Sequence, residues 1–154
     1  MSIAIRSAAL DELTEVLGLL SECGLPREGV AEHFDGFLVA REEGALRGVA
    51  GLEIYGDVAL LRSLAVRPAA RGKGWGGKLV QSLMEVAQER NIRTLYLLTE
   101  TAEGFFPRFG FERIPRDRMD ARLEASRELQ GVGVCPESAV AMRLDLSHLR
   151  AGAS

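Results

Sequence analysis

Apolar and polar positions alternate along the chain with two different periods, and each change of period predicts a new element. Residues 2–6 alternate isoleucine with small or polar neighbours, which predicts a first strand. From Leu10 the apolar residues recur at helical spacing until Gly24, where we expect the first helix to end. The polar stretch 27–35 has a weaker apolar pattern, which fits either a short helix or a loop.

Three consecutive antiparallel strands are expected next. The apolar-rich segments 36–41 and 45–54 flank a Glu-Glu-Gly turn, which is typical of a hairpin, and a Gly-Asp turn then leads into the strand 58–66. After a glycine-rich stretch, apolar residues on one face predict an amphipathic helix over 76–90. The following apolar segment 94–98 is expected to lie parallel to the preceding strand, because a helix connects the two.

The last third of the chain predicts shorter elements. We expect a short helix over 102–109 that ends at Gly110, a charged and solvated helix over 115–127, and a final strand over 139–146. The order of elements indicates an α/β fold with a mixed sheet. A length of 154 residues suits one domain, residues 1–154, with a sizeable core.

Composition narrows the classes of function. The formal net charge is −3, which argues against a general nucleic-acid or membrane binder, so any attraction for anions must be local. The two cysteines, Cys23 and Cys135, lie far apart and form no CxxC pair, so neither a disulfide framework nor a zinc site is expected. No signal peptide and no membrane span are expected, and the protein is predicted to be cytoplasmic.

A glycine-rich segment after the third of these strands carries the chemistry. Four glycines fall within six residues, with basic neighbours: Arg71, Gly72, Lys73, Gly74, Gly76 and Gly77. Glycine lets the backbone approach a ligand closely, and the first N–H groups of the following helix lack partners at the positive end of its dipole. Together these features predict a phosphate site.

Other motifs compete for the same segment. The dinucleotide fingerprint G-x-G-x-x-G is satisfied, but it belongs after a strand in a βαβ unit, and this segment follows antiparallel strands. Most of a P-loop is present as well, yet Leu79 stands where a hydroxyl should bind Mg²⁺. A tight turn without a ligand would seldom need so many glycines with basic neighbours.

Two further motifs carry a family resemblance. Arg71-Gly-Lys-Gly-Trp-Gly76, preceded by Leu64-Ala-Val-Arg-Pro68, matches [Arg/Gln]-x-x-Gly-x-[Gly/Ala], and 104–111 resembles a later Phe-Tyr-x-x-x-Gly-Phe segment. The chain therefore resembles the GNAT acetyltransferase superfamily over almost its whole length. The resemblance implies a GNAT-like mixed, mostly antiparallel central sheet with helices on both faces. Dimerisation is common on that fold.

The resemblance also implies a cofactor site for acetyl-CoA as co-substrate, without a metal. The backbone of Leu64, Ala65 and Val66 would pair with the pantetheine arm. The pyrophosphate would lie on the loop and first helical turn, formed by Arg71, Gly72, Lys73, Gly74, Trp75, Gly76 and Gly77.

Within the superfamily, the segments 51–66, 95–106 and 135–140 look like the arsenic-resistance N-acetyltransferase-like subfamily. This implies that the acceptor is a small amine, which includes an amino-acid-like molecule or an arsenical or phosphinic toxin. Amide formation from a thioester is expected to proceed by direct transfer in a ternary complex. A non-catalytic acyl-CoA sensor on the same fold is the alternative.

The catalytic groups are harder to place. Phe106 occupies the position of the family's usual acid, a tyrosine, so the acid is open and Tyr96 is one candidate. Glu53, among apolar residues in the middle of a strand, is the candidate base, although a structural salt bridge would explain it as well. His33 lies in the early segment that often covers the acceptor in the family, and Cys135 is more typical of a packing residue.

Overall fold

One seven-stranded sheet organises the computed structural model, which describes residues 3–99, 102, 104–126 and 139–147. The strand order is β1-β2-β3-β4-β5-β7-β6, and every neighbouring pair is antiparallel except β4 with β5. The strands are β1 (Ile3–Ser7), β2 (Phe37–Glu42), β3 (Ala45–Tyr55), β4 (Val58–Val66), β5 (Thr94–Thr99), β6 (Glu112–Ile114) and β7 (Val140–Asp145).

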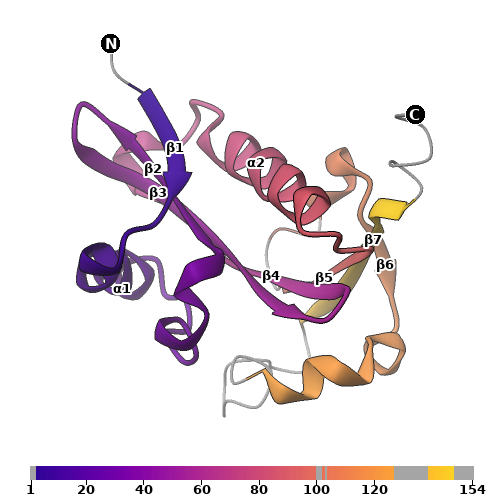
Figure 1. The fold of residues 1–154 in the computed structure, drawn as a ribbon. Coiled ribbons are helices and arrows are strands. Elements are labelled where there is room, and N and C mark those ends of the chain that lie inside the picture. The colour runs from indigo at the N-terminus through magenta and orange to yellow at the C-terminus, as the bar shows by residue number, and fades with distance from the viewer. Residues whose placement is uncertain (1–2, 100–101, 103, 127–138, 148–154) are drawn as a thin grey trace.

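Helices cover both faces of this sheet, as Figure 1 shows. The α-helices of the described residues are α1 (Leu13–Glu22) and α2 (Trp75–Glu89), and they lie on opposite faces. The short 3-10 helices are Leu10–Glu12, Ala31–Gly36, Pro68–Ala70, Phe106–Phe109, Arg116–Arg118 and Ala121–Ala125. The mixed, mostly antiparallel sheet between helices confirms the predicted fold class.

Strand periodicity explains how the two faces acquire separate cores. In β3, Leu52 points into the α2 core, whereas Val49 points into the α1 core with Val16 and Leu20. Helix α2 presents its apolar stripe, including Leu79 and Leu83, to the other side of the sheet. Alternate side chains of a strand face opposite sides, so the same strands serve both cores.

The sheet is interrupted between β4 and β5. These parallel strands pair only through Val58–Leu60 and Thr94–Tyr96. Beyond that point β5 continues its pairing with β7, while β4 continues only against β3. On the β5 side, residues 61–66 of β4 therefore have no ladder partner among the strands that the structure describes.

A β-bulge lies at the start of this unpaired stretch. Ser63 and Leu64 of β4 stand opposite the one residue Ala50 of β3. Ser63 has a φ of 60°, a left-handed conformation that few non-glycine residues adopt. The extra residue bends β4 where it leaves β5.

Elements in the last third of the chain differ from the sequence prediction. The continuous helix expected over 115–127 is wrong: residues 116–118 and 121–125 form separate 3-10 helices. Among the described residues of this segment, Leu123 is the one buried apolar side chain, so an apolar stripe that could hold a longer helix against the sheet is missing. Strand β6 was not expected, because its three residues are too short to show a period.

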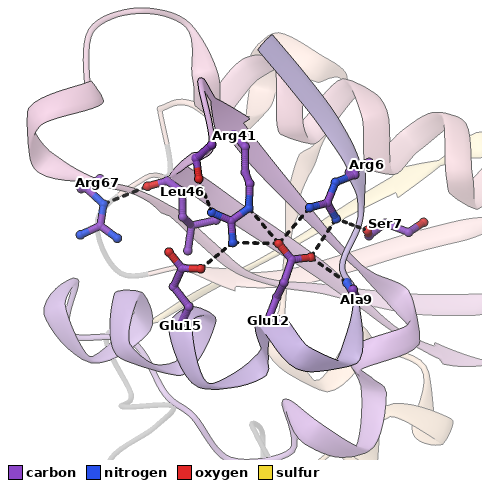
Figure 2. A network of polar contacts seen from close by, with 9 residues as sticks. Arg6, Ser7, Ala9, Glu12, Glu15, Arg41, Leu46 and Arg67 are labelled. Carbon is purple, nitrogen blue, oxygen red and sulfur yellow. Dashed lines mark hydrogen bonds and ion pairs between the residues drawn. The ribbon is translucent and has the colours of Figure 1, made fainter. Parts of the chain in front are cut away.

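A polar network ties the first strands to the first helix (Figure 2). The Glu12 carboxylate accepts hydrogen bonds from Arg6 of β1 at 2.8 and 3.0 Å and from Arg41 of β2 at 2.8 Å. It also accepts one from the backbone N–H of Ala9 at 2.8 Å, which satisfies a free donor at the helix start. Arg41 reaches Glu15 of α1 as well.

Among the described helices, none combines the length and the apolar character needed to cross a bilayer. Within the described residues, no three His, Cys, Asp or Glu side chains are grouped so that they could hold a metal ion.

Candidate active site

The glycine-rich segment forms an exposed loop at the N-terminus of α2. Gly72 and Gly74 both have a φ of 82°, and a Cβ added at either would meet no atom within 4 Å. Gly74 is the N-cap of α2, which begins at Trp75. The first N–H groups of α2 have no partner within the helix, so the loop presents donors at the positive end of the helix dipole.

The basic and aromatic residues of this segment have different surroundings. The Arg71 guanidinium donates to the Val66 carbonyl at 3.1 Å, which holds the loop against the end of β4. Lys73 is exposed on the loop. Trp75 is only 3% exposed and packs in the α2 core, so its side chain is not available to a ligand on the loop. Arg67 instead pairs with Glu22 of α1 at 3.1 Å.

A cluster of phenyl rings packs beside the first turn of α2. A Cβ added at Gly76 would lie 3.6 Å from the Phe105 ring, and one at Gly77 would lie 3.6 Å from Phe109. Phe106, which stands at the position of the family's usual tyrosine, is 4% exposed and lies edge-on to Phe105, with ring centroids 5.2 Å apart. The Phe106 ring therefore fills this position by apolar packing, without a hydroxyl.

The predicted pantetheine residues lie on the unpaired stretch of β4. The side chains of Leu64 and Val66 pack against the α2 core, whereas Ala65 is buried in the α1 core. Their backbone runs from the bulge at Ser63 towards the glycine loop. The predicted cofactor residues are thus brought together, with the strand edge leading to the helix N-terminus.

A buried ion pair lies on the α1 face of the sheet, beside that stretch. Arg62 of β4 donates to the Glu53 carboxylate of β3 at 2.5 Å, and both side chains are 0% exposed. Arg62 also donates to the carbonyls of Glu28 and Pro26, at 2.6 and 3.2 Å, and to the Ser63 hydroxyl at 2.9 Å. The pair therefore joins the bulge to the segment that follows α1.

Two more side chains reach the other oxygen of this carboxylate. The Tyr55 hydroxyl donates to Glu53 Oε1 at 2.5 Å, and His33 Nε2 lies 3.6 Å from the same atom. The His33 and Tyr55 rings are tilted against each other, with centroids 5.7 Å apart. Burial, together with the hydrogen bond to Glu53, raises the pKa of Tyr55. Glu53 is thus the centre of a four-residue cluster of Glu53, Arg62, Tyr55 and His33.

Tyr96 lies on the same face as this cluster but does not touch it in any described contact. Its side chain packs with Val58, Leu60 and Leu123, and the residue is 7% exposed. Leu60 pairs with Glu53 on one side and with Tyr96 on the other, so the three form a row across the sheet. Two strand spacings separate Glu53 from Tyr96, a backbone distance of about 10 Å.

Sequence reasoning missed the partnership of Glu53 with Arg62 and the conformation of Ser63. The register of the β3–β4 hairpin could have indicated that these two charged residues share a face, since both stand among apolar neighbours. The left-handed φ of a serine has no signal in sequence. Cys135 lies outside the described residues.

Comparison with known proteins agrees with this geometry. Residues 9–111 match the model of the Acetyltransferase (GNAT) family. An uncharacterized N-acetyltransferase of Chlorobaculum tepidum is 34% identical over 97 residues, 62% of each chain. An amino-acid acetyltransferase of Mycobacterium tuberculosis is 32% identical over 124 residues, which are 79% of this chain and 63% of the relative. The chain therefore spans less than two thirds of these curated relatives.

Among solved structures, N-acetylglutamate synthase of Neisseria gonorrhoeae complexed with coenzyme A and N-acetyl-glutamate has a similar fold. Its TM-score is 0.78 at 22% identity, and the match covers 95% of this chain and 35% of that one. Three observations lead to the same family assignment: the interrupted sheet, the glycine loop at the start of α2, and the family model that spans most of the chain. The chain belongs to the acetyltransferase (GNAT) family.

Proposed function

We propose that this protein is an acetyl-CoA-dependent N-acetyltransferase that acetylates the amino group of a small, amino-acid-like molecule. The unpaired edge of β4, which ends at the N-terminus of α2, is the observation that carries this proposal. An extended arm with amide groups can pair with such an edge as an added strand would, and a helix N-terminus is suited to the phosphates at the end of that arm.

Acetyl-CoA would bind with its pantetheine along Leu64–Val66 and its pyrophosphate over the backbone of Gly72–Gly77. The N–H groups of the α2 start would donate to the phosphate oxygens, and Lys73 is exposed to add charge. The structural neighbour from Neisseria gonorrhoeae, which holds coenzyme A, supports this choice of donor.

The acceptor is proposed to be an α-amino acid or a close analogue. Amino-acid acetyltransferases from several bacteria match about three quarters of this chain, which supports that class. The resemblance to the arsenic-resistance subfamily adds arsenical and phosphinic amino-acid analogues to the candidates. The acceptor would approach the thioester from the α1 face, opposite α2, where the Glu53 cluster lies.

The reaction needs a neutral amine, a polarised carbonyl and a proton for the departing thiolate. We propose that Glu53, whose side chain is fully buried, receives a proton from the ammonium through an intervening water, and that a backbone N–H near Leu64 or Ala65 polarises the carbonyl. The Tyr96 hydroxyl, in the same row as Glu53, is the proposed donor to the thiolate, and the second proton that the nitrogen loses as the tetrahedral intermediate collapses restores it. Transfer would then be direct, without an acyl-enzyme.

A thiol-release assay tests the function. Protein and acetyl-CoA are mixed with a panel of the common amino acids, their arsenical and phosphinic analogues, simple polyamines and a short peptide with a free N-terminus. We expect free coenzyme A to form with at least one amino acid or analogue. Tight binding of acetyl-CoA without thiol release from any amine would instead favour the sensor, and release with the peptide alone would refute the small-molecule acceptor.

A Glu53→Gln variant tests the base. It keeps the shape of the side chain but cannot take up the ammonium proton as a carboxylate does. We expect kcat to fall by roughly a hundredfold at neutral pH while the KM for acetyl-CoA changes little. A rate equal to that of the wild type across the pH range would remove Glu53 from the mechanism.

A further inference from the structure

We infer that His33 is the exit through which the proton taken from the acceptor amine leaves the buried site. This inference rests on the function proposed above and adds a second residue to its proton transfer. Its basis is the contact of His33 with the buried Glu53 carboxylate and the partial exposure of the imidazole, whose side chain is 24% exposed.

The proton balance requires such an exit. An ammonium acceptor brings three protons on nitrogen: one stays on the amide product, and one is needed by the thiolate released when the C–S bond breaks. The third must reach solvent before the amine can form the C–N bond. If Glu53 takes this proton, it must pass it on in every cycle, yet its own side chain has no exposed surface.

The contacts of Glu53 leave one suitable recipient. Of the described side chains that touch this carboxylate, Arg62 holds its protons permanently and cannot accept another. The Tyr55 hydroxyl already donates its proton to Oε1, and burial raises the pKa of Tyr55. His33 Nε2 can accept a proton, and its distance of 3.6 Å from Oε1 is one that a small ring rotation or a bridging water would close.

The surroundings of the imidazole suit a transient positive charge. Glu53 and Tyr55 face it from β3, with Arg62 of β4 behind the carboxylate. Glu32 and Asp35 lie on the same 3-10 helix as His33, but both are exposed, so solvent screens their charges. A proton that moves from Glu53 to His33 creates an imidazolium beside the restored carboxylate. The proton then passes from the exposed part of the imidazole to water, and Glu53 and His33 return to their starting protonation states.

The steady-state kinetics of three variants test the inference, with the acceptor that the thiol-release assay identifies. His33→Gln keeps a polar side chain but cannot carry the proton, and His33→Ala leaves space for free imidazole. Asp35→Asn is the matched control, because Asp35 lies on the same 3-10 helix, is exposed and has no contact with Glu53. Thermal melting and acetyl-CoA binding are measured for each variant.

We expect kcat of the His33→Gln variant to fall at least about tenfold at neutral pH, with the KM for acetyl-CoA within twofold of the wild type. Imidazole added to His33→Ala should restore kcat in proportion to its concentration, and it should leave the Asp35→Asn and wild-type rates unchanged. A purely structural role for His33 would not produce that rescue.

The inference is overturned if His33→Gln keeps both the kcat and the pH profile of the wild type, or if His33→Ala loses activity without any response to imidazole. Either result leaves the proposed function in place, because the wild type still turns over. Failure of the wild type with every acceptor would instead overturn the proposed function, and with it the reaction from which this proton comes.

Discussion

Glu53 and Arg62 are two charges that the chain keeps away from water. Removing a carboxylate and a guanidinium from solvent costs several kcal/mol each, and their mutual attraction offsets this only when hydrogen bonds complete the geometry. Here Arg62 has a carboxylate, two carbonyls and a hydroxyl as acceptors. The pair thereby links β3, β4 and the segment after α1 at the face where we place the acceptor.

Removal of one partner is expected to be far worse than removal of both. Arg62→Met should lower the free energy of unfolding by about 3–5 kcal/mol, because it leaves the Glu53 carboxylate buried without its cation. The double variant with Glu53→Met should recover part of that loss. Urea denaturation of wild type, both single variants and the double variant measures this. A double variant less stable than Arg62→Met would contradict the expectation.

Glu12 provides a second residue-scale prediction, one that depends on pH. Hydrogen bonds from Arg6 chiefly, with help from Ala9 and Arg41, lower the pKa of Glu12 from 4.5 to about 2. Because the pKa of Glu12 is lower in the folded state than in the unfolded state, its ionised carboxylate stabilises the fold. This stabilisation is complete above about pH 4.5 and is lost as pH falls towards 2. Because Arg6 is about half exposed, solvent screens its ion pair with Glu12. We therefore expect the Glu12 carboxylate to add only about 1–2 kcal/mol to the free energy of unfolding.

Comparison of the wild type with Glu12→Gln checks this. The difference in free energy of unfolding between the two should be present at pH 7 and should shrink steadily between pH 4.5 and pH 2. Chemical denaturation at a series of pH values provides the measurement. A difference that stays constant down to pH 2 would show that the lost ion pairs are not its source.

At the scale of elements, the function depends on the junction between β4 and α2. The strand contributes an unpaired backbone edge, and the helix contributes unpartnered N–H groups at its first turn. The loop between them reverses the chain with two glycines in the left-handed region. Neither element forms a site alone, so the geometry of the loop determines whether the two can hold one ligand.

Gly74 tests this junction, and Gly44 is its matched control. Both have a left-handed φ, of 82° and 84°, and an added Cβ would meet nothing within 4 Å at either. Gly74→Val and Gly44→Val should therefore lose similar stability, about 1–2 kcal/mol from backbone strain. Only Gly74→Val should weaken acetyl-CoA binding, by tenfold or more. Calorimetric titration checks this, and unchanged binding by Gly74→Val would refute the assigned phosphate site.

The elements that sequence could predict are those with a long period. The amphipathic pattern of α2 and the consecutive strands β2, β3 and β4 were expected within a residue or two of their observed ends. The parallel pairing of β4 with β5 followed from the intervening helix and is confirmed. Residues 115–127 were misjudged because charge alone cannot hold a helix on a sheet, and β6 is too short to show a pattern.

The site was predictable in part for a related reason. A loop that presents backbone donors to a phosphate needs glycines, and these can be recognised in the sequence, so the phosphate loop could be predicted. The ion pair of Glu53 with Arg62 depends on strand register, and the contact with His33 depends on how a 3-10 helix packs on β3. Such contacts between segments far apart in the chain are set by tertiary packing, which local patterns do not encode.

At the scale of the whole molecule, the sheet consists of two parts. Strands β1–β4 form one antiparallel group and β5–β7 form another, and in the described part of the chain only three ladder pairs join them. Helix α2 packs along the first group, with contacts to β2, β3 and β4. The boundary between the two groups is the place where we propose that acetyl-CoA binds.

This division has a consequence for cooperativity. Two groups of strands joined by a short seam can open as separate units, each with its own free energy of exchange. A pantetheine arm paired along β4 would complete the missing ladder and make the two units open together. In native-state hydrogen exchange of the free protein, we expect the amides of β5 and β7 to exchange faster than those of β2 and β3. Binding of acetyl-CoA should reduce this difference in exchange rate. The co-substrate would then act, during its residence, as an eighth strand of the sheet.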